Sequence, residues 1–419
     1  MLISPTQPFK ESLAPFPPSP PREPILGHYR KLPLENAHLK HLEYVRKYNS
    51  DIVYFNVFGN HMIVLRWQKF ANEILDKRGA NYMDRPRFVL FDVMGWGLTL
   101  TFTPYGPRFK LPRSALQTNF IKSAIVNYRP IQEDEARQAV ARILRKPADW
   151  DKSLRRFASA IVLRIGFGVV VKSNDDPYIE IATNANLATY PGTTLVDYMP
   201  IFQSTENEKA GVPNEMDMAD IQGATASVFI AGSNTTLATT TVAVLNMVMN
   251  PYVFRKAREE IDSVVGLERL PTLADRAALR YIDYLVEETT GWRPLSPIGI
   301  PHKSLQDDVY EGMFMPKGTY VYYNTYAMSR DPSVYKDPES FNPDRYTPKE
   351  EGGDGEPFLV GPFGFGRRIC VGRHLAQASV WIIMATFIAT MELEMRVGVD
   401  GKPIEQNRED SAKIASRAL

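Results

Sequence analysis

The feature that most constrains the fold is an internal stretch without charged side chains, residues 221–254. At about 1.5 Å per residue, a helix of this length would cross a whole domain. The stretch carries many Ser, Thr and Asn side chains, which a single lipid-facing span rarely does. We therefore expect a long helix in the core of a globular domain, which begins near Asp217 or Asp220 and ends at Asn250, before a proline.

The remaining periodicity is mostly helical. Apolar residues at helical spacing predict helices over residues 34–48, 68–77, 131–144, 149–167 and 253–265. Short β-rich runs predict a hairpin of residues 52–58 and 61–65 with its turn at 59–60, and one more strand at 319–323. Proline, aspartate and glycine predict a long irregular loop over 331–362. The fold class is therefore mainly α with a small β part.

Composition narrows the classes of function. Lys and Arg number 49 against 48 Asp and Glu, so we expect no nucleic-acid partner, which would need a basic surplus. One cysteine cannot form an internal disulfide, which favours a reducing, cytosol-facing compartment. The proline-rich segment 15–24 is stiff and extended, either as a disordered tail or as a hinge. We expect residues 1–27 to be a tail and hinge and residues 28–419 to form one domain.

The chemistry concentrates near Cys370, the only cysteine. Glycines at 361, 364 and 366 keep the preceding loop thin, so that a flat ligand can approach its backbone. An apolar helical run follows, and the helix dipole, the nearby amides and neighbouring arginines would lower the pKa of the thiol. This arrangement suits a haem, with an arginine for its propionates. The alternatives are a buried structural cysteine and a catalytic thiol with His374 as its base.

Five residues around this cysteine carry a family resemblance: Phe363, Gly366, Arg368, Cys370 and Gly372. Their spacing resembles the haem-binding signature of the cytochrome P450 family at every defined position. The resemblance implies the cytochrome P450 fold in a single haem domain, and a haem b (iron protoporphyrin IX) whose iron is ligated by Cys370. A thiolate ligand favours O–O cleavage. By the same resemblance Arg368 binds a haem propionate and Phe363 packs near the sulfur.

The long central stretch contains a second match. Residues 231–236, Ala-Gly-Ser-Asn-Thr-Thr, resemble the oxygen-activation motif of the family. The resemblance makes Gly232 the small residue over the haem and Thr235 the hydroxyl that relays protons. Asn234 stands where the family usually has an acid, and an amide cannot carry a proton at neutral pH.

Further matches concern the residues that hold the haem and its loop. Arg113 and His302 resemble the family's other propionate contacts, and Glu288 and Arg345 resemble members of its buried ion-pair cluster. Gly291 stands where that cluster has an arginine. Since loss of one partner of a buried charge cluster costs about 3–5 kcal/mol, we expect weakened haem retention.

The implied activity is NADPH-driven monooxygenation of an apolar small molecule with O2. The implied partners are NADPH-cytochrome P450 reductase and cytochrome b5, and the implied location is the cytosolic face of the endoplasmic reticulum membrane. The chain most resembles fungal, basidiomycete-like members of secondary metabolism, with a short roof between Pro200 and Ile221 and no final hairpin. The alternatives are a non-catalytic or inactive haem-binding remnant, a peroxide-using haem-thiolate enzyme and a cysteine-dependent hydrolase.

Overall fold

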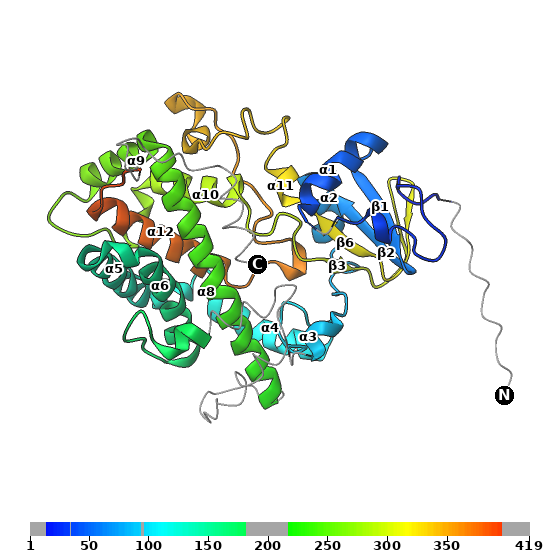
Figure 1. The fold of residues 1–419 in the computed structure, drawn as a ribbon, viewed down its shortest axis with the longest axis horizontal. Coiled ribbons are helices and arrows are strands. Elements are labelled where there is room, and N and C mark those ends of the chain that lie inside the picture. The colour runs from blue at the N-terminus through cyan, green and yellow to red at the C-terminus, as the bar shows by residue number, and fades with distance from the viewer. Residues whose placement is uncertain (1–13, 34, 94–95, 182–216, 396–419) are drawn as a thin grey trace. The chain divides into compact units, whose positions relative to one another are not determined.

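The computed structural model describes residues 14–33, 35–93, 96–181 and 217–395 (Figure 1). They belong to two compact units, each assembled from separate stretches of the chain. Unit 1 takes its residues from 1–86, 298–327 and 365–368, and unit 2 from 87–297, 328–364 and 369–419. The single domain expected over 28–419 stays a prediction.

Unit 1 is built on a four-stranded sheet with the strand order β1-β2-β6-β3. The hairpin of β1 (Ile52–Val57) and β2 (Asn60–Leu65) is antiparallel, as predicted. Its turn lies at residues 58–59, one position before the predicted one, and both residues have positive φ as the favoured type I′ turn requires. Strand β6 (Tyr320–Tyr323) runs parallel to β2, and β3 (His302–Lys303) runs antiparallel to β6.

The other elements of unit 1 are short. Strands β4 and β5 form a separate antiparallel hairpin. The predicted helix over 68–77 is an α-helical turn followed by a π-helical segment. The elements are η1 (Tyr29–Lys31), α1 (Ala37–Tyr48), α2 (Gln68–Ala71), η2 (Asn72–Lys77), β4 (Asp308–Tyr310), β5 (Met313–Met315) and η10 (Gly366–Arg368).

The proline-rich segment is a fixed part of unit 1. The carbonyl of Pro18 accepts the N–H of Tyr54 at 2.9 Å, and the carbonyl of Pro20 accepts a bond from the His28 ring at 2.7 Å. The ring of Phe16 stacks on Tyr54 with centroids 4.9 Å apart. Proline lacks an N–H but its carbonyl still accepts hydrogen bonds. The alternative of a disordered tail is therefore wrong for residues 15–24.

Unit 2 contains the long helices, and the predicted ones are present within a few residues of their expected bounds. Where the sequence predicts a loop over 331–362, the structure has only two short 3-10 segments. The elements are α3 (Val89–Val93), α4 (Pro107–Phe120), η3 (Ile125–Tyr128), α5 (Arg129–Arg145), η4 (Pro147–Asp149), α6 (Trp150–Phe167), α8 (Met218–Met249), α9 (Pro251–Val264), η7 (Asp275–Ala277), α10 (Arg280–Trp292), η8 (Pro343–Tyr346), η9 (Lys349–Glu351) and α12 (Arg373–Thr390), with α11 (Thr325–Met328) at the passage from unit 1.

Helix α8 is the predicted central helix. Asp217 caps it by accepting the N–H of Asp220 at 2.8 Å, and the helix ends one residue before Asn250. It packs against α4, α6, α10 and α12 of the same unit (Figure 1). Among the described residues only α8 is long and apolar enough to cross a membrane, and 44% of its most apolar stretch is buried. Core helices pass the same test.

The core of unit 2 lies around α12. Its residues 380–385 are buried without interruption, because α5, α8, α9 and α10 pack around it. A helix that is apolar on all sides must be enclosed in this way.

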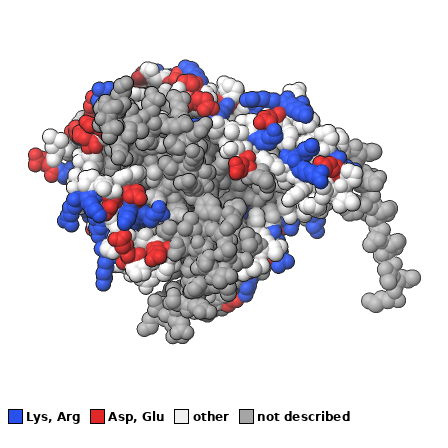
Figure 2. Space-filling view, viewed as in Figure 1, with Lys and Arg blue, Asp and Glu red and all other residues white. Residues whose placement is uncertain are grey.

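Charged side chains of both signs are interspersed over the described surface visible in Figure 2. This distribution agrees with the balanced composition of 49 basic and 48 acidic side chains.

The start of α10 has an unusual cap, and removing it should destabilise unit 2. Glu260 of α9 accepts the N–H groups of Tyr281 at 2.8 Å and Ile282 at 3.3 Å. Glu260→Ala should lower the free energy of unfolding by about 1–3 kcal/mol, because these amides lose their acceptor. Urea unfolding followed by circular dichroism measures the change. The exposed Glu259→Ala is the control, and equal losses from both variants would contradict the capping role.

Candidate functional site

Cys370 lies two residues after η10 and three before α12, at the start of the helix as the sequence predicts. Its own N–H donates to the carbonyl of Phe363 at 2.8 Å, which closes the loop between them. The backbone N–H groups of Gly372 and Arg373 point to the sulfur. The side chain keeps exposed surface, so a ligand can reach it.

The pKa of the Cys370 thiol is raised, which corrects the expectation from sequence. The helix amides and the guanidinium groups of Arg113 and Arg373 do lower this pKa, as expected. Crowding by surrounding protein atoms removes water from the thiolate, however, and this cost is larger. The thiol is therefore the resting form, and a metal that binds the sulfur has to displace the proton.

Arg113 of α4 is held against the residue next to this cysteine. Its guanidinium donates to the carbonyl of Ile369 at 2.6 Å, and burial lowers its pKa while Cys370 raises it. Arg373 donates to the carbonyl of Cys370 at 3.1 Å. Both arginines therefore hold the backbone around the sulfur in place, and their positive charges act on the sulfur.

Arg368 belongs to a buried group in unit 1. Its Nε donates to the carbonyl of Met83 at 2.6 Å. The turn before it depends on Gly366, which has a φ of +55°. A Cβ at Gly366 would lie 2.0 Å from the carbonyl oxygen of Leu75. The position requires glycine because the backbone at Leu75 occupies the space that a side chain would need. The expectation that this glycine is kept for a flat ligand is thus not needed to explain it.

His302 lies in the same buried group. Its Nδ1 donates to the carbonyl of Tyr82 at 2.8 Å, and its pKa is well below the usual range because of burial and then the charge of Arg85. A neutral imidazole bonded in this way presents Nε2 as an acceptor. It could donate to a propionate only after taking up a proton, which an arriving carboxylate would favour.

Arg85 is a residue that sequence reasoning missed as part of the site. It is buried and donates to the carbonyls of Ile300 at 3.0 Å and Pro301 at 2.6 Å, directly before His302. It therefore fixes the backbone that carries the histidine. A charged residue before a proline was visible in the sequence, but nothing there indicated its partners more than 200 positions away.

Residues 231–236 of α8 face two different sides of the helix. Ala231 is exposed and Thr235 half-buried, and the Thr235 hydroxyl donates to the Ala231 carbonyl at 2.5 Å. Asn234 is also half-buried. A Cβ at Gly232 would lie 2.4 Å from Cγ1 of Val162 on α6, so this glycine serves close packing of the two helices. Ala231 is the small residue that shares the open side with Thr235.

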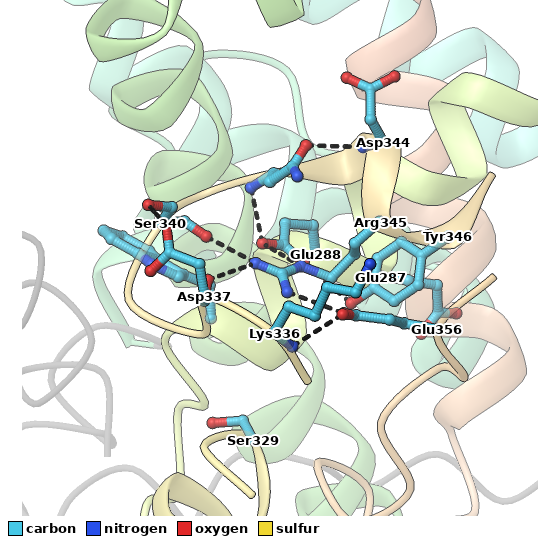
Figure 3. A network of polar contacts seen from close by, with 12 residues as sticks. Glu287, Glu288, Ser329, Lys336, Asp337, Ser340, Asp344, Arg345, Tyr346 and Glu356 are labelled. Atoms are coloured by element: carbon cyan, nitrogen blue, oxygen red, sulfur yellow. Dashed lines mark hydrogen bonds and ion pairs between the residues drawn. The ribbon is translucent and has the colours of Figure 1, made fainter. Parts of the chain in front are cut away.

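Glu288 and Arg345 come together in a buried polar network in unit 2 (Figure 3). Arg345 Nε lies 3.1 Å from Glu288, and its Nη1 donates to Glu356 at 2.8 Å. The other end of the guanidinium donates to the carbonyls of Asp337 and Ser340, both at 2.9 Å. Sequence reasoning found the first pair but missed Glu356, since no spacing rule connects the two. This network fixes the irregular chain that leads to Cys370.

The donor set fits a haem iron. Within the described part of the chain, no three His, Cys, Asp or Glu side chains group as metal ligands. Cys370 instead offers one reachable sulfur with amide donors around it. A single protein thiolate is the ligand set of a haem-thiolate iron. The expectations of a short roof and of a missing final hairpin fall on parts of the chain outside the described residues.

Glu287, next to Glu288, should make stability depend on pH. Burial and then Asp283 raise its pKa to about 7, against Arg276 and a 2.9 Å bond from Gln377. Since the folded pKa exceeds the ordinary 4.5, the folded state binds the proton more tightly, and stability falls as pH rises from about 4.5 to 7. Glu287→Gln should remove this loss.

The gain should be about 1–3 kcal/mol at pH 8 and absent near pH 4.5. Urea unfolding at both pH values measures it, with the exposed Glu259→Gln as the control. A pH-independent effect of Glu287→Gln would show that the buried carboxyl does not titrate in this interval.

Comparison with known proteins agrees with this chemistry. A family model described as Cytochrome P450 matches residues 17–207 and 183–417. Cytochrome P450 monooxygenase 105 of Postia placenta is 34% identical over 434 residues, which cover 90% of this chain and 82% of that protein. Cytochrome P450 monooxygenase COX2 of Coprinopsis cinerea is 31% identical over 454 residues, which cover 94% and 86%.

The fold is shared with a solved structure. The zebra fish cytochrome P450 determined with progesterone superposes with a TM-score of 0.74 at 22% identity, over 85% of this chain and 92% of that one. Family model, fungal relatives and fold coincide with the geometry around Cys370. The chain therefore belongs to the cytochrome P450 family, a family of haem-iron enzymes in which its fungal relatives are named monooxygenases.

Proposed function

We propose that this protein is a haem-thiolate monooxygenase that inserts one oxygen atom from O2 into an apolar organic substrate. The observation that carries the proposal is the reachable sulfur of Cys370, ringed by two backbone amides, Arg113 and Arg373. Bound haem b supplies the activation of dioxygen. The protein supplies binding, orientation and electrostatics around it.

Each site residue has a proposed task. Cys370 ligates the iron, and Phe363 and Gly372 shape the loop around the sulfur. Arg368, Arg113 and His302 bind the propionates: the two guanidinium groups supply positive charge, and His302 donates once it has taken up a proton.

On α8, Thr235 lies on the proposed proton path, Asn234 offers hydrogen bonds beside it, and Gly232 keeps α8 close to α6. A threonine hydroxyl that donates to its own helix can still accept a hydrogen bond from water through a free lone pair.

NADPH-cytochrome P450 reductase is the proposed electron donor, with cytochrome b5 as a second partner. The exposed Arg367 is the proposed cation for an acidic partner. Among the described residues its guanidinium donates only to the sulfur of Met83, at 3.7 Å, whereas those of Arg113 and Arg373 donate to backbone carbonyls. On family resemblance we propose the cytosolic face of the endoplasmic reticulum membrane and a role in secondary metabolism.

The ligand assignment predicts a spectrum. The purified protein, reduced and exposed to carbon monoxide, should show the Soret band of a thiolate-ligated ferrous complex. Cys370→Ser should abolish that band, while His374→Ala, four residues away, should keep it. A histidine-type band in the unchanged protein, or a thiolate band that survives Cys370→Ser, would overturn the assignment.

Asn234 favours a second candidate, a haem-thiolate enzyme that uses peroxide. Peroxide brings its own protons, whereas the path from O2 requires protons from the enzyme, and an amide carries none. Asn234→Asp should raise the ratio of reductase-driven to peroxide-driven product by roughly 10- to 100-fold. Product formation with NADPH and reductase, compared with hydrogen peroxide, measures this ratio.

Asn234→Gln is the matched control and should leave the ratio unchanged. If the unchanged protein forms product with peroxide alone and Asn234→Asp does not alter this, the peroxide-using enzyme is the better description. If neither oxidant gives turnover of any apolar substrate offered, the inactive haem-binding alternative holds.

A further inference from the structure

Glu288 is a buried acid that needs hydrogen-bond donors in place of water. The backbone N–H of Asn342 donates to its Oε1 at 2.8 Å, and Arg345 Nε lies 3.1 Å from its Oε2. The third donor is the hydroxyl of Tyr346, at 2.9 Å from Oε2. Burial raises the pKa of Glu288, and the three donors offset only part of this effect. The buried acid therefore depends on these donors in place of water.

Gly291 lies one turn further along α10, on the face of Glu288. Tyr346 and Leu359 border the space in which a side chain at this position would begin. A Cβ at this position would lie 3.8 Å from the Tyr346 hydroxyl and 3.7 Å from Cβ of Leu359. A first carbon fits at ordinary contact distance, but a longer side chain would have to enter the place that Tyr346 and Leu359 occupy.

We propose that Tyr346 is a positioning residue for Glu288. With glycine at position 291, the Tyr346 hydroxyl supplies the hydrogen bond that a second cationic partner of this acid would otherwise give. Its hydroxyl completes the donor set of the acid without a charge. On this proposal the glycine does not leave the cluster short of a hydrogen-bond donor, in contrast to the expectation from sequence. The proposal goes beyond the oxygenase function and rests on the geometry of this cluster.

The surroundings of Tyr346 suit a fixed donor. Its ring is buried and packs edge-on against Phe358 with centroids 5.0 Å apart, and near Tyr284 at 6.1 Å. Burial and the neighbouring carboxylate of Glu288 raise its pKa far above the usual range. The hydroxyl therefore keeps its proton, and remains a donor, at any pH at which the protein folds.

The consequence reaches the chain before Cys370. Arg345 lies between two acids, with Nε 3.1 Å from Glu288 and Nη1 donating to Glu356 at 2.8 Å. Glu356 in turn accepts the N–H of Lys336 at 2.8 Å and donates its own N–H to the Arg345 carbonyl at 2.9 Å. This fixes the chain five residues before Gly361, where the haem loop begins.

The test is a double-mutant cycle on the full chain with Tyr346→Phe and Gly291→Arg. Tyr346→Phe should lower the thermal unfolding midpoint of haem-free protein by roughly 2–4 °C. Gly291→Arg should lower it in the unchanged background, where Tyr346 fills the space. In the Tyr346→Phe background the same arginine should raise the midpoint, because it can then donate to Glu288.

This reversal of sign is the readout that a merely structural tyrosine would not give. Tyr335→Phe is the matched control, since Tyr335 is buried nearby and does not donate to Glu288. Haem retained after gel filtration should follow the same order. An effect of Tyr346→Phe no larger than that of Tyr335→Phe would overturn the proposal, as would strictly additive effects or a stabilising Gly291→Arg in the unchanged background.

The measurement on haem-free protein keeps this test separate from the oxygenase proposal, because unfolding needs neither haem nor substrate. Where Gly291→Arg gives no folded protein, Gly291→Gln supplies a shorter neutral donor. The same reversal is expected with glutamine, and its absence would count against the proposal in the same way.

Discussion

The irregular part of unit 2 before Gly361 depends on the contacts of one side chain, the guanidinium of Arg345. It makes four contacts at once, with Glu288, Glu356 and the carbonyls of Asp337 and Ser340. The chain from 329 to 364 has almost no regular structure, so backbone ladders cannot hold it. Five rigid donors on one side chain can replace such a ladder. The cost is a buried charge that needs carboxylates around it, and any change in them affects the whole segment.

At Cys370, burial and the neighbouring groups act in opposite directions on the pKa of the thiol. Helix amides and two arginines favour the thiolate of Cys370, yet the exclusion of water favours the thiol more. If Cys370 ligates the iron, as proposed, binding of haem is coupled to loss of the thiol proton. Burial likewise keeps the pKa of His302 well below its usual range, so its imidazole is neutral.

The sequence predicts the elements of this fold well and their contacts poorly. Helix α8 could be predicted because thirty uncharged residues with a cap and a proline stop leave few alternatives. The sequence could indicate that positions 232 and 366 require glycine. It could not indicate which part of the protein occupies the space left by the missing side chain. The structure shows the side chain of Val162 against one and the Leu75 carbonyl against the other. Glu356 and Tyr346 could not be predicted as partners of Glu288 and Arg345, because their meeting depends on how the irregular chain folds back.

Gly291 illustrates why a missing motif residue is weak evidence of a missing function. A buried carboxylate requires donors within hydrogen-bond distance. A neutral donor can supply one, although a charged donor bonds more strongly and lowers the pKa further. A tyrosine from η8 satisfies the geometry and leaves two acids to share one guanidinium. With tyrosine in place of an arginine, the cluster has a hydrogen bond at this position but one positive charge fewer, so the substitution alters the electrostatic balance of the cluster.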